Sequence, residues 1–194
     1  MAERHRDLDR LLTFVDAVVA IAITLLVLPL AEAGGEVGEG DAAQVLSTHT
    51  DDLFGFALSF VVIAQLWLAQ HRIVSGLVRQ STALIWLLLA WAFTIVFLPF
   101  PTSLVATTDH DPLAKILYVG TMAVSSAVLA LVAWVIRSDR SLRDTDEAPH
   151  VLTSVSVTVA FVLALAIMLV FPDLSYWPLL LLALIGPVER LIRR

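Results

Sequence analysis

The chain has 194 residues, of which 59% are hydrophobic and only 15% charged, and its formal net charge at pH 7 is −6. Soluble domains are normally about 45–50% apolar and about 25% charged, so this composition excludes an ordinary soluble domain and indicates an integral membrane protein. The chain contains no cysteine, which excludes disulfides, thiolate metal sites and cysteine nucleophiles.

The first apolar segment covers residues 11–30, which is long enough to cross a bilayer because about 20 residues are needed. It is longer than the apolar core of a signal peptide and lacks a small-residue cleavage pattern, so we predict a retained helix. Asp16 lies inside this segment, and Arg10 lies just before it. An acid within the bilayer costs about 2.5–3.5 kcal/mol and usually meets a partner or marks a polar path. We therefore expect functional residues in this segment.

A stripe of mostly apolar residues follows Asp16 along the same predicted helix. At 100° per residue, four residues share one face: Ile21, Thr24, Leu25 and Leu28. Asp16 lies about 140° away from Ile21, so the stripe and the acid face different neighbours. A ring of branched apolar side chains around a symmetry axis can close a pore by dewetting. The alternative from periodicity alone is that this stripe is ordinary packing.

Further apolar segments predict an all-α bundle of six transmembrane helices forming one domain, residues 1–194. The expected helices cover about 11–30, 53–74, 82–104, 113–136, 151–171 and 175–192. All lysines and arginines except Lys115 then lie on one side of the membrane. Because cytoplasmic loops carry an excess of basic residues, both termini are predicted to be cytoplasmic.

The opposite side is predicted to carry a flexible, glycine-rich and acidic loop over residues 31–52. Two interpretations remain open. The loop is either a solvated connection, as charge runs in loops usually are, or a rim that attracts cations to a pore mouth.

Polar and aromatic residues on the second and third helices are candidate partners for Asp16. Trp67 and His71 are four residues apart and share a helix face, with Gln70 beside them. Trp86 lies near the start of the third helix. His71 and Trp86 each have an alternative role at the membrane interface, where tryptophan is enriched.

Enzyme signals are poor. The five histidines lie in different segments, and the sequence contains no HExxH, GxSxG, P-loop or GxGxxG motif. We therefore predict no enzyme activity, no catalytic residue, no metal site, no cofactor and no nucleic-acid partner. The sequence also lacks TVGYG, which excludes the ordinary potassium-channel filter.

Three motifs resemble the endolysosomal potassium-channel family known as transmembrane protein 175, in its short prokaryotic branch. The family's R-x-x-x-F-S-D signature matches Arg10, Phe14 and Asp16. Its second-helix pattern matches Ser59-Phe60 followed by Trp67 and His71, and its third-helix pattern matches Trp86 followed by Pro99-Phe-Pro-Thr102. The resemblance covers the first three helices, and the first helix is the most specific.

The resemblance implies a potassium-permeable cation channel in the cell membrane of a prokaryote. Such proteins are homotetramers in which the first helix of each subunit lines the pore. Ile21 would match the hydrophobic constriction, with Thr24, Leu25 and Leu28 further along the pore wall. A polar network would hold the first helix against the next two: Arg10, Phe14, Asp16, Trp67, Gln70, His71 and Trp86. The only partners implied are other copies of the chain and the lipid bilayer.

The sequence departs from the family pattern at three positions around this network. Val15 replaces the signature serine, Gln70 replaces the first histidine of a pair, and Leu88 stands where an asparagine is common. A second function therefore stays open, a small proton- or cation-coupled transporter in which Asp16 titrates.

Overall fold

The computed structural model describes residues 2–35, 42–108, 111–144 and 149–170. These residues form helices and no strand, which confirms the all-α prediction for this part of the chain. The elements in chain order are α1 (Ala2–Leu25), α2 (Leu28–Gly35), α3 (Ala42–Thr48), α4 (Thr50–Val74), α5 (Thr82–Phe97), α6 (Pro99–Thr107), α7 (Pro112–Ser138), the 3₁₀ turn η1 (Arg140–Leu142) and α8 (Val151–Val170).

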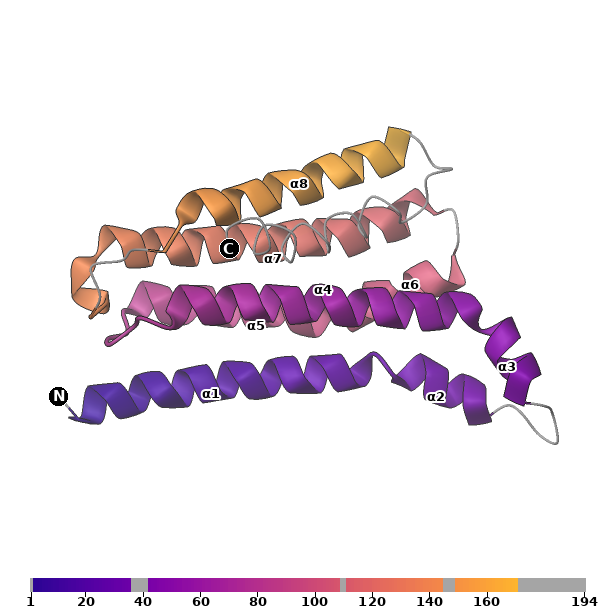
Figure 1. Cartoon of the computed structure of the whole chain (residues 1–194), viewed down its shortest axis with the longest axis horizontal. Helices are drawn as coiled ribbons and strands as arrows, with labels where there is room; N and C mark the ends of the chain where they lie inside the picture. The colour runs from indigo at the N-terminus through magenta and orange to yellow at the C-terminus, as the bar shows by residue number, and fades with distance from the viewer. Residues whose placement is uncertain (1, 36–41, 109–110, 145–148, 171–194) are drawn as a thin grey trace, which may run out of the picture.

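The long helices lie side by side along one direction, and α7 is central among them (Figure 1). Helix α7 packs against α8, α5, α6 and α4, whereas α1 lies at the edge of the bundle and packs mainly against α5. The N-terminus and η1 lie at the same end of the bundle (Figure 1). We call this end the N-terminal end.

Within the described residues, five segments are long and apolar enough to cross a membrane. They are Arg6–Glu32, Thr50–Val74, Thr82–Thr107, Pro112–Ser138 and Val151–Val170. Each overlaps one of the first five helices predicted from the sequence. The sixth predicted helix, 175–192, lies outside the described residues.

The first predicted helix is not continuous, because a short turn interrupts the helix between α1 and α2. Helix α1 ends at Leu25 and α2 begins at Leu28, next to Pro29. Proline has no backbone N–H, and its ring clashes with the carbonyl four residues earlier, which here belongs to Leu25. The amide of Leu26 instead donates to the carbonyl three residues earlier, that of Ile23, and the amide of Val27 donates to the carbonyl of Thr24, each at 3.3 Å. This tighter turn separates the outer part of the segment from α1.

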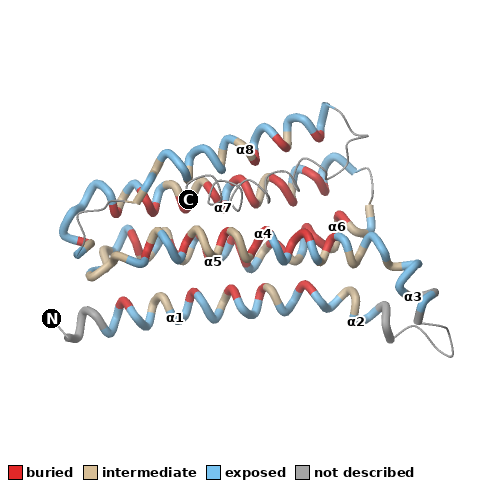
Figure 2. Tube along the Cα trace, in the orientation of Figure 1, coloured by how far each residue is buried: buried red, intermediate tan, exposed pale blue. Residues whose placement is uncertain are grey.

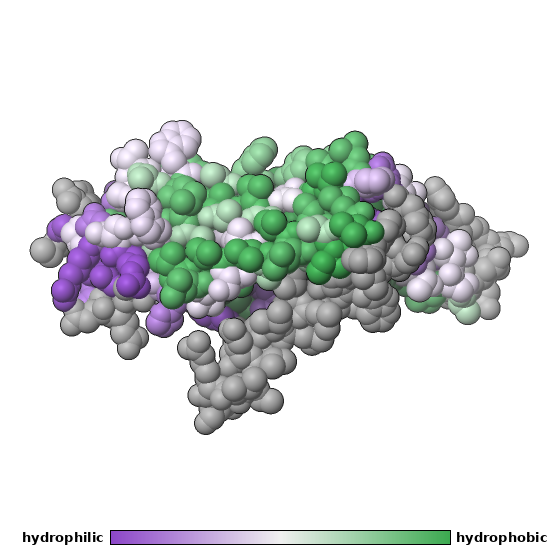
Figure 3. All heavy atoms as spheres, turned by 90° about the horizontal axis from the view of Figure 1, so that it is seen from above, coloured by the Kyte–Doolittle hydropathy of each residue, from purple (hydrophilic) through white to green (hydrophobic). Residues whose placement is uncertain are grey.

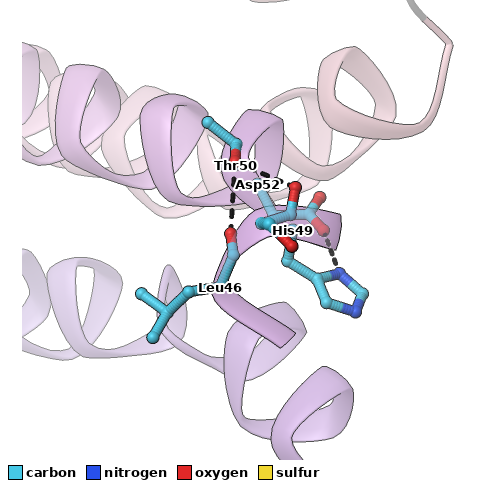
Figure 4. A network of polar contacts seen from close by, with 5 residues as sticks. Leu46, His49, Thr50 and Asp52 are labelled. Carbon is cyan, nitrogen blue, oxygen red and sulfur yellow. Dashed lines mark hydrogen bonds and ion pairs between the residues drawn. The ribbon is translucent and has the colours of Figure 1, made fainter. Parts of the chain in front are cut away.

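The acidic connection after the first segment contains more helix than we expected. Helix α2 continues to Gly35, α3 covers Ala42–Thr48, and α4 already begins at Thr50. At the corner between α3 and α4, His49 Nδ1 lies 2.8 Å from Asp52 Oδ2, and Thr50 donates to the Leu46 carbonyl at 3.1 Å (Figure 4). The prediction of a flexible loop over 31–52 is therefore wrong at both ends of this range.

The core runs along the inner faces of the helices, and each helix has an outward face that is exposed (Figure 2). A chain of buried hydroxyl groups crosses this core. Ser59 of α4 forms hydrogen bonds with Thr102 of α6 at 2.9 Å and with Tyr118 of α7 at 2.7 Å. Thr102 also donates to the Leu98 carbonyl at 2.8 Å. Three helices are thus joined at one point, because buried hydroxyl groups need partners.

Replacing Ser59 with alanine is expected to lower the free energy of unfolding by about 1–3 kcal/mol, since the change breaks two buried hydrogen bonds. The measurement is reversible unfolding in mixed detergent. The control is Ser156→Ala on α8, where an exposed hydroxyl bonds only to the Leu152 carbonyl. This control is expected to change the free energy by about 0.5 kcal/mol or less. Equal effects for the two variants would contradict a role for the buried network.

At the N-terminal end, the loop after α4 is tied to the loop after α7. The amide of Val78 donates to the Leu142 carbonyl at 2.9 Å, and the amide of Asp144 donates to the Gly76 carbonyl at 3.3 Å. Asp139 begins η1 by accepting hydrogen bonds from the hydroxyl and the amide of Ser141. These bonds favour the carboxylate and lower the pKa of Asp139 below its usual 3.8. The turn is therefore held by a fully ionised carboxylate at neutral pH.

Candidate functional site

Helix α1 has one buried and one exposed face. The buried face packs Val15, Val19, Ala22 and Leu26 into the core at helical spacing. The opposite face carries the stripe that periodicity placed together: Ile21, Thr24, Leu25 and Leu28 are all exposed. The Ile21 side chain is 58% exposed in the single chain. The stripe is therefore not part of the packing within this chain.

Thr24 is the one polar residue of the stripe. Its hydroxyl donates to the carbonyl of Ile21 at 2.7 Å. The proton is thus directed to the backbone, while the oxygen keeps a lone pair for another donor or for a cation. The residue can offer an oxygen ligand one turn beyond Ile21.

Asp16 lies on the side of α1 that faces α4. Trp67 Nε1 donates a hydrogen bond to Asp16 Oδ1 at 2.8 Å. The rings of Trp67 and His71 follow one another on α4, with centroids 5.7 Å apart. The structure thus joins Asp16 and Trp67 directly and places His71 beside Trp67. Asp16 still remains exposed in the single chain.

Among the described residues, three other members of the predicted network form no hydrogen bond or ion pair with Asp16. Arg10 and Phe14 are exposed, and Trp86 is 67% exposed on α5. Arg10 makes no ion pair with Asp16, since the ion pair among the described residues is His49 with Asp52. The helix explains this, because six residues correspond to about 240° of rotation and Arg10 therefore lies on another face. The wider polar network that the motif implies stays a prediction.

The three departures from the family pattern all occupy buried positions. Val15 and Leu88 have no exposed surface and belong to the apolar core. Gln70 is 1% exposed, and its Oε1 atom has no hydrogen-bond partner among the described residues. Two polar groups are thus replaced by core residues, and the third leaves an unpaired acceptor inside the bundle. Sequence reasoning identified these departures but did not predict their burial.

Sequence reasoning also missed the link between Ser59, Thr102 and Tyr118. Two of these residues belong to the motifs on which the resemblance rests, the Ser59-Phe60 pair and the Pro-Phe-Pro-Thr run ending at Thr102. The signal was therefore present, because both motifs supply a hydroxyl to the same buried contact. In the part of the chain that the structure describes, no group of three metal-ligating side chains comes together.

Comparison with known proteins agrees with this arrangement of membrane helices. Residues 10–99 match the family described as endosomal/lysosomal potassium channel TMEM175. A protein of Chamaesiphon minutus named a potassium channel is 33% identical over 117 residues, which cover 59% of this chain and 57% of that protein. A protein of Streptomyces collinus, also named a potassium channel, is 32% identical over 97 residues, which cover 50% of this chain and 47% of that protein. The zebrafish relative (Danio rerio), named an endosomal/lysosomal proton channel, is 28% identical over 123 residues, or 63% of this chain and 24% of that protein.

A solved structure supports the fold over nearly the whole length. The crystal structure of a lysosomal potassium-selective channel TMEM175 homolog from Chamaesiphon minutus matches with a TM-score of 0.63 and 23% identity, covering 97% of this chain and 98% of that one. The molecule is thus a multi-pass helical membrane protein. Over residues 10–99 it is similar to the TMEM175 family, and its fold is that of a bacterial TMEM175 homolog. The chain matches about half of the length of its curated bacterial relatives and about a quarter of the vertebrate ones.

Proposed function

We propose that this protein is a passive, potassium-permeable cation channel assembled from four copies of the chain. In this assembly the exposed stripe of α1 from each copy faces a central axis, and Ile21 forms the hydrophobic constriction. The bacterial relatives that are named potassium channels and the shared fold support this proposal.

The exposed carboxylate of Asp16 is the observation that carries the proposal. Asp16 lies within the first membrane-spanning segment, at the edge of the bundle, with Trp67 as its hydrogen-bond donor. A carboxylate facing hydrocarbon costs about 2.5–3.5 kcal/mol. Covering it by a second copy of the chain removes the carboxylate from lipid. The same assembly brings the α1 stripes together, because α1 is an edge helix.

The chemistry of the stripe fits a pore that closes by excluding water. Ile21 and Leu25 present branched apolar side chains, and Thr24 supplies an oxygen next to them. A ring of isoleucines dewets a narrow constriction, and the adjacent hydroxyl oxygens replace part of the hydration shell of a cation. Opening then requires only a small widening of the ring.

The experiment that tests this proposal combines flux with mass. Purified protein is reconstituted in vesicles loaded with potassium, an outward gradient is imposed with a protonophore present, and the assay is repeated with sodium. The mass of the detergent-solubilised protein is measured by light scattering. A mass near four times 21.1 kDa with non-saturating potassium flux supports the proposal. A monomer, or a tetramer without flux, overturns it.

The second candidate is a proton- or cation-coupled transporter in which Asp16 titrates. Two observations support this candidate: the vertebrate relatives are named proton channels, and the Asp16 side chain is exposed in the single chain. It predicts flux that saturates with substrate and that Asp16→Asn abolishes without loss of assembly. A channel predicts linear flux in the same vesicles.

The orientation belongs to the same proposal. The N-terminal end carries the arginine-rich loops, and the other end carries the acidic corner around Asp52. We place the N-terminal end in the cytoplasm of a prokaryotic cell, with the protein in the plasma membrane, because basic residues favour that side.

A further inference from the structure

A small cavity lies between the α1–α2 segment, α4 and α6, toward the end of the bundle opposite the N-terminal end. Its volume is about 50 Å³, and it is partly open to the surroundings. A buried water needs about 10–15 Å³ by the same measure, so the cavity has room for roughly four groups of that size. The cavity can therefore hold a small ligand.

The walls of this cavity are mostly apolar. They are formed by Leu26, Pro29 and Leu30 at the break between α1 and α2, by Phe56 of α4 and by Ala106 of α6. Among the described residues that line the cavity, none belongs to the exposed stripe of α1, so the cavity is separate from the proposed pore face. Because burying apolar surface is favourable, these walls favour a ligand with a hydrocarbon part.

The polar side chains of the lining can only accept hydrogen bonds from a ligand. They are Asp52, Thr102, Ser103 and Thr107. Thr102 and Ser103 each direct their hydroxyl proton to a backbone carbonyl of the preceding turn at 2.8 Å, and Thr107 does the same at 3.1 Å. A hydroxyl has one proton and two lone pairs, and a carboxylate has lone pairs only. The polar part of the ligand must therefore be a donor.

Asp52 places a negative charge at the outer end of the cavity. It lies in the first turn of α4, level with Thr107, the last residue of α6. Its Oδ2 atom lies 2.8 Å from Nδ1 of His49 (Figure 4), whereas its Oδ1 atom has no hydrogen-bond partner among the described residues. A positively charged donor is thus the complement of this end.

The opposite, inner end of the cavity is buried. Leu26 and Thr102 are 3% and 7% exposed. Thr102 lies five residues before Thr107, which corresponds to about 7.5 Å of helix. Figure 3 shows hydrophobic side chains over the middle of the molecule and hydrophilic ones toward both of its ends. The cavity therefore runs from the polar end of the bundle into its apolar part.

We propose that this cavity binds a primary alkylammonium ion with a short unbranched chain. The ammonium group donates its three N–H bonds to Asp52 Oδ1 and to the hydroxyl oxygens beside it, and the chain fills the apolar part next to Leu26 and Ala106. A potassium ion would use the oxygens but leave the apolar walls without a partner. The headgroup of phosphatidylethanolamine does not fit, because its ammonium is linked to a phosphate, and the lining offers that phosphate no side-chain donor.

The test is binding of n-butylammonium to the purified full chain in detergent, measured by saturation-transfer NMR. Its four carbons match the room in the cavity. Asp52→Asn is expected to weaken binding about tenfold, because one charge-assisted contact is lost. The matched control is Asp51→Asn, which removes an exposed carboxylate from the same turn of α4 outside the cavity. Its binding is expected to stay within about twofold of the wild type.

A second pair of variants tests the apolar part without changing any charge. Ala106→Leu is expected to weaken binding at least tenfold, because the larger side chain occupies the cavity. Its control, Ala57→Leu, adds the same group at an exposed position of α4 that does not line the cavity, and is expected to bind as the wild type does. This pair also replaces the first one if Asp52→Asn does not fold.

Two other probes distinguish the alkylammonium ion from its parts. 1-Butanol keeps the chain without the charge, and potassium keeps the charge without the chain. Both are expected to bind at least tenfold more weakly than n-butylammonium. Equal binding of 1-butanol, full displacement by an equal concentration of potassium, or unchanged binding in Asp52→Asn and Ala106→Leu would each overturn the assignment. None of these measurements depends on ion flux, so their outcome is independent of the proposed channel activity.

Discussion

Replacing Ile21 with asparagine is expected to raise potassium flux about tenfold or more in reconstituted vesicles. The side chain is largely exposed on the proposed pore face of α1. A ring of amide groups would hold water where a ring of isoleucines excludes it. A tenfold increase requires the barrier at the constriction to fall by about 1.4 kcal/mol. The measurement is potassium efflux under an imposed gradient, at equal protein content per vesicle.

The matched control is Ile116→Asn, which makes the same substitution at an exposed isoleucine of α7. Helix α7 does not carry the proposed pore face, so its potassium flux is expected to equal that of the wild type. If Ile21→Asn leaves the flux unchanged, Ile21 is not the constriction. If both variants leak equally, the increase reflects a general loss of packing.

Breaking the contact between Asp16 and Trp67 is expected to give the largest loss of stability among single polar contacts of α1. The indole donates to a carboxylate at 2.8 Å, and hydrogen bonds to charged groups contribute about 1.5–3 kcal/mol. A double-mutant cycle with Asp16→Ala and Trp67→Phe isolates this contribution, because neither variant keeps its half of the hydrogen bond. We expect a coupling free energy of about 1.5–3 kcal/mol from reversible unfolding in mixed detergent.

The control cycle pairs Asp16→Ala with Trp134→Phe. Trp134 is an exposed tryptophan of α7 and is not a hydrogen-bond partner of Asp16. The effects of these two substitutions on the free energy of unfolding are therefore expected to be additive within about 0.5 kcal/mol. A coupling of the same small size in the Asp16–Trp67 cycle would mean that this hydrogen bond does not hold α1 to α4.

Positions of the membrane helices follow directly from hydropathy. The described spans Thr50–Val74, Pro112–Ser138 and Val151–Val170 agree with the predicted ranges to within a few residues at each end. Length and apolar content decide these positions, since the bilayer requires both. Breaks and short helices were harder to predict. The break before Pro29 interrupts an apolar run that looks continuous, and α3 lies in a stretch whose glycines and acids are typical of a loop.

The candidate site was predictable on one helix and only partly between helices. Periodicity placed Ile21, Thr24, Leu25 and Leu28 on one face, and all four are exposed together. Contacts between helices depend on rotation and depth, which a pattern along one helix does not contain. The bond from Ser59 to Tyr118, which are 59 residues apart, was missed for the same reason.

The two residues of the hydrogen bond between Trp67 and Asp16 are synthesised at different times. Its two residues are 51 positions apart, and ribosomes add about 5–20 residues per second, so the donor is made roughly 3–10 seconds after the acid. Helix α5, against which α1 mainly packs, is made later still. The whole of α1 is therefore synthesised before the first residue of α4 or of α5. Its retention at that stage depends on its own apolar length and on the machinery that inserts it.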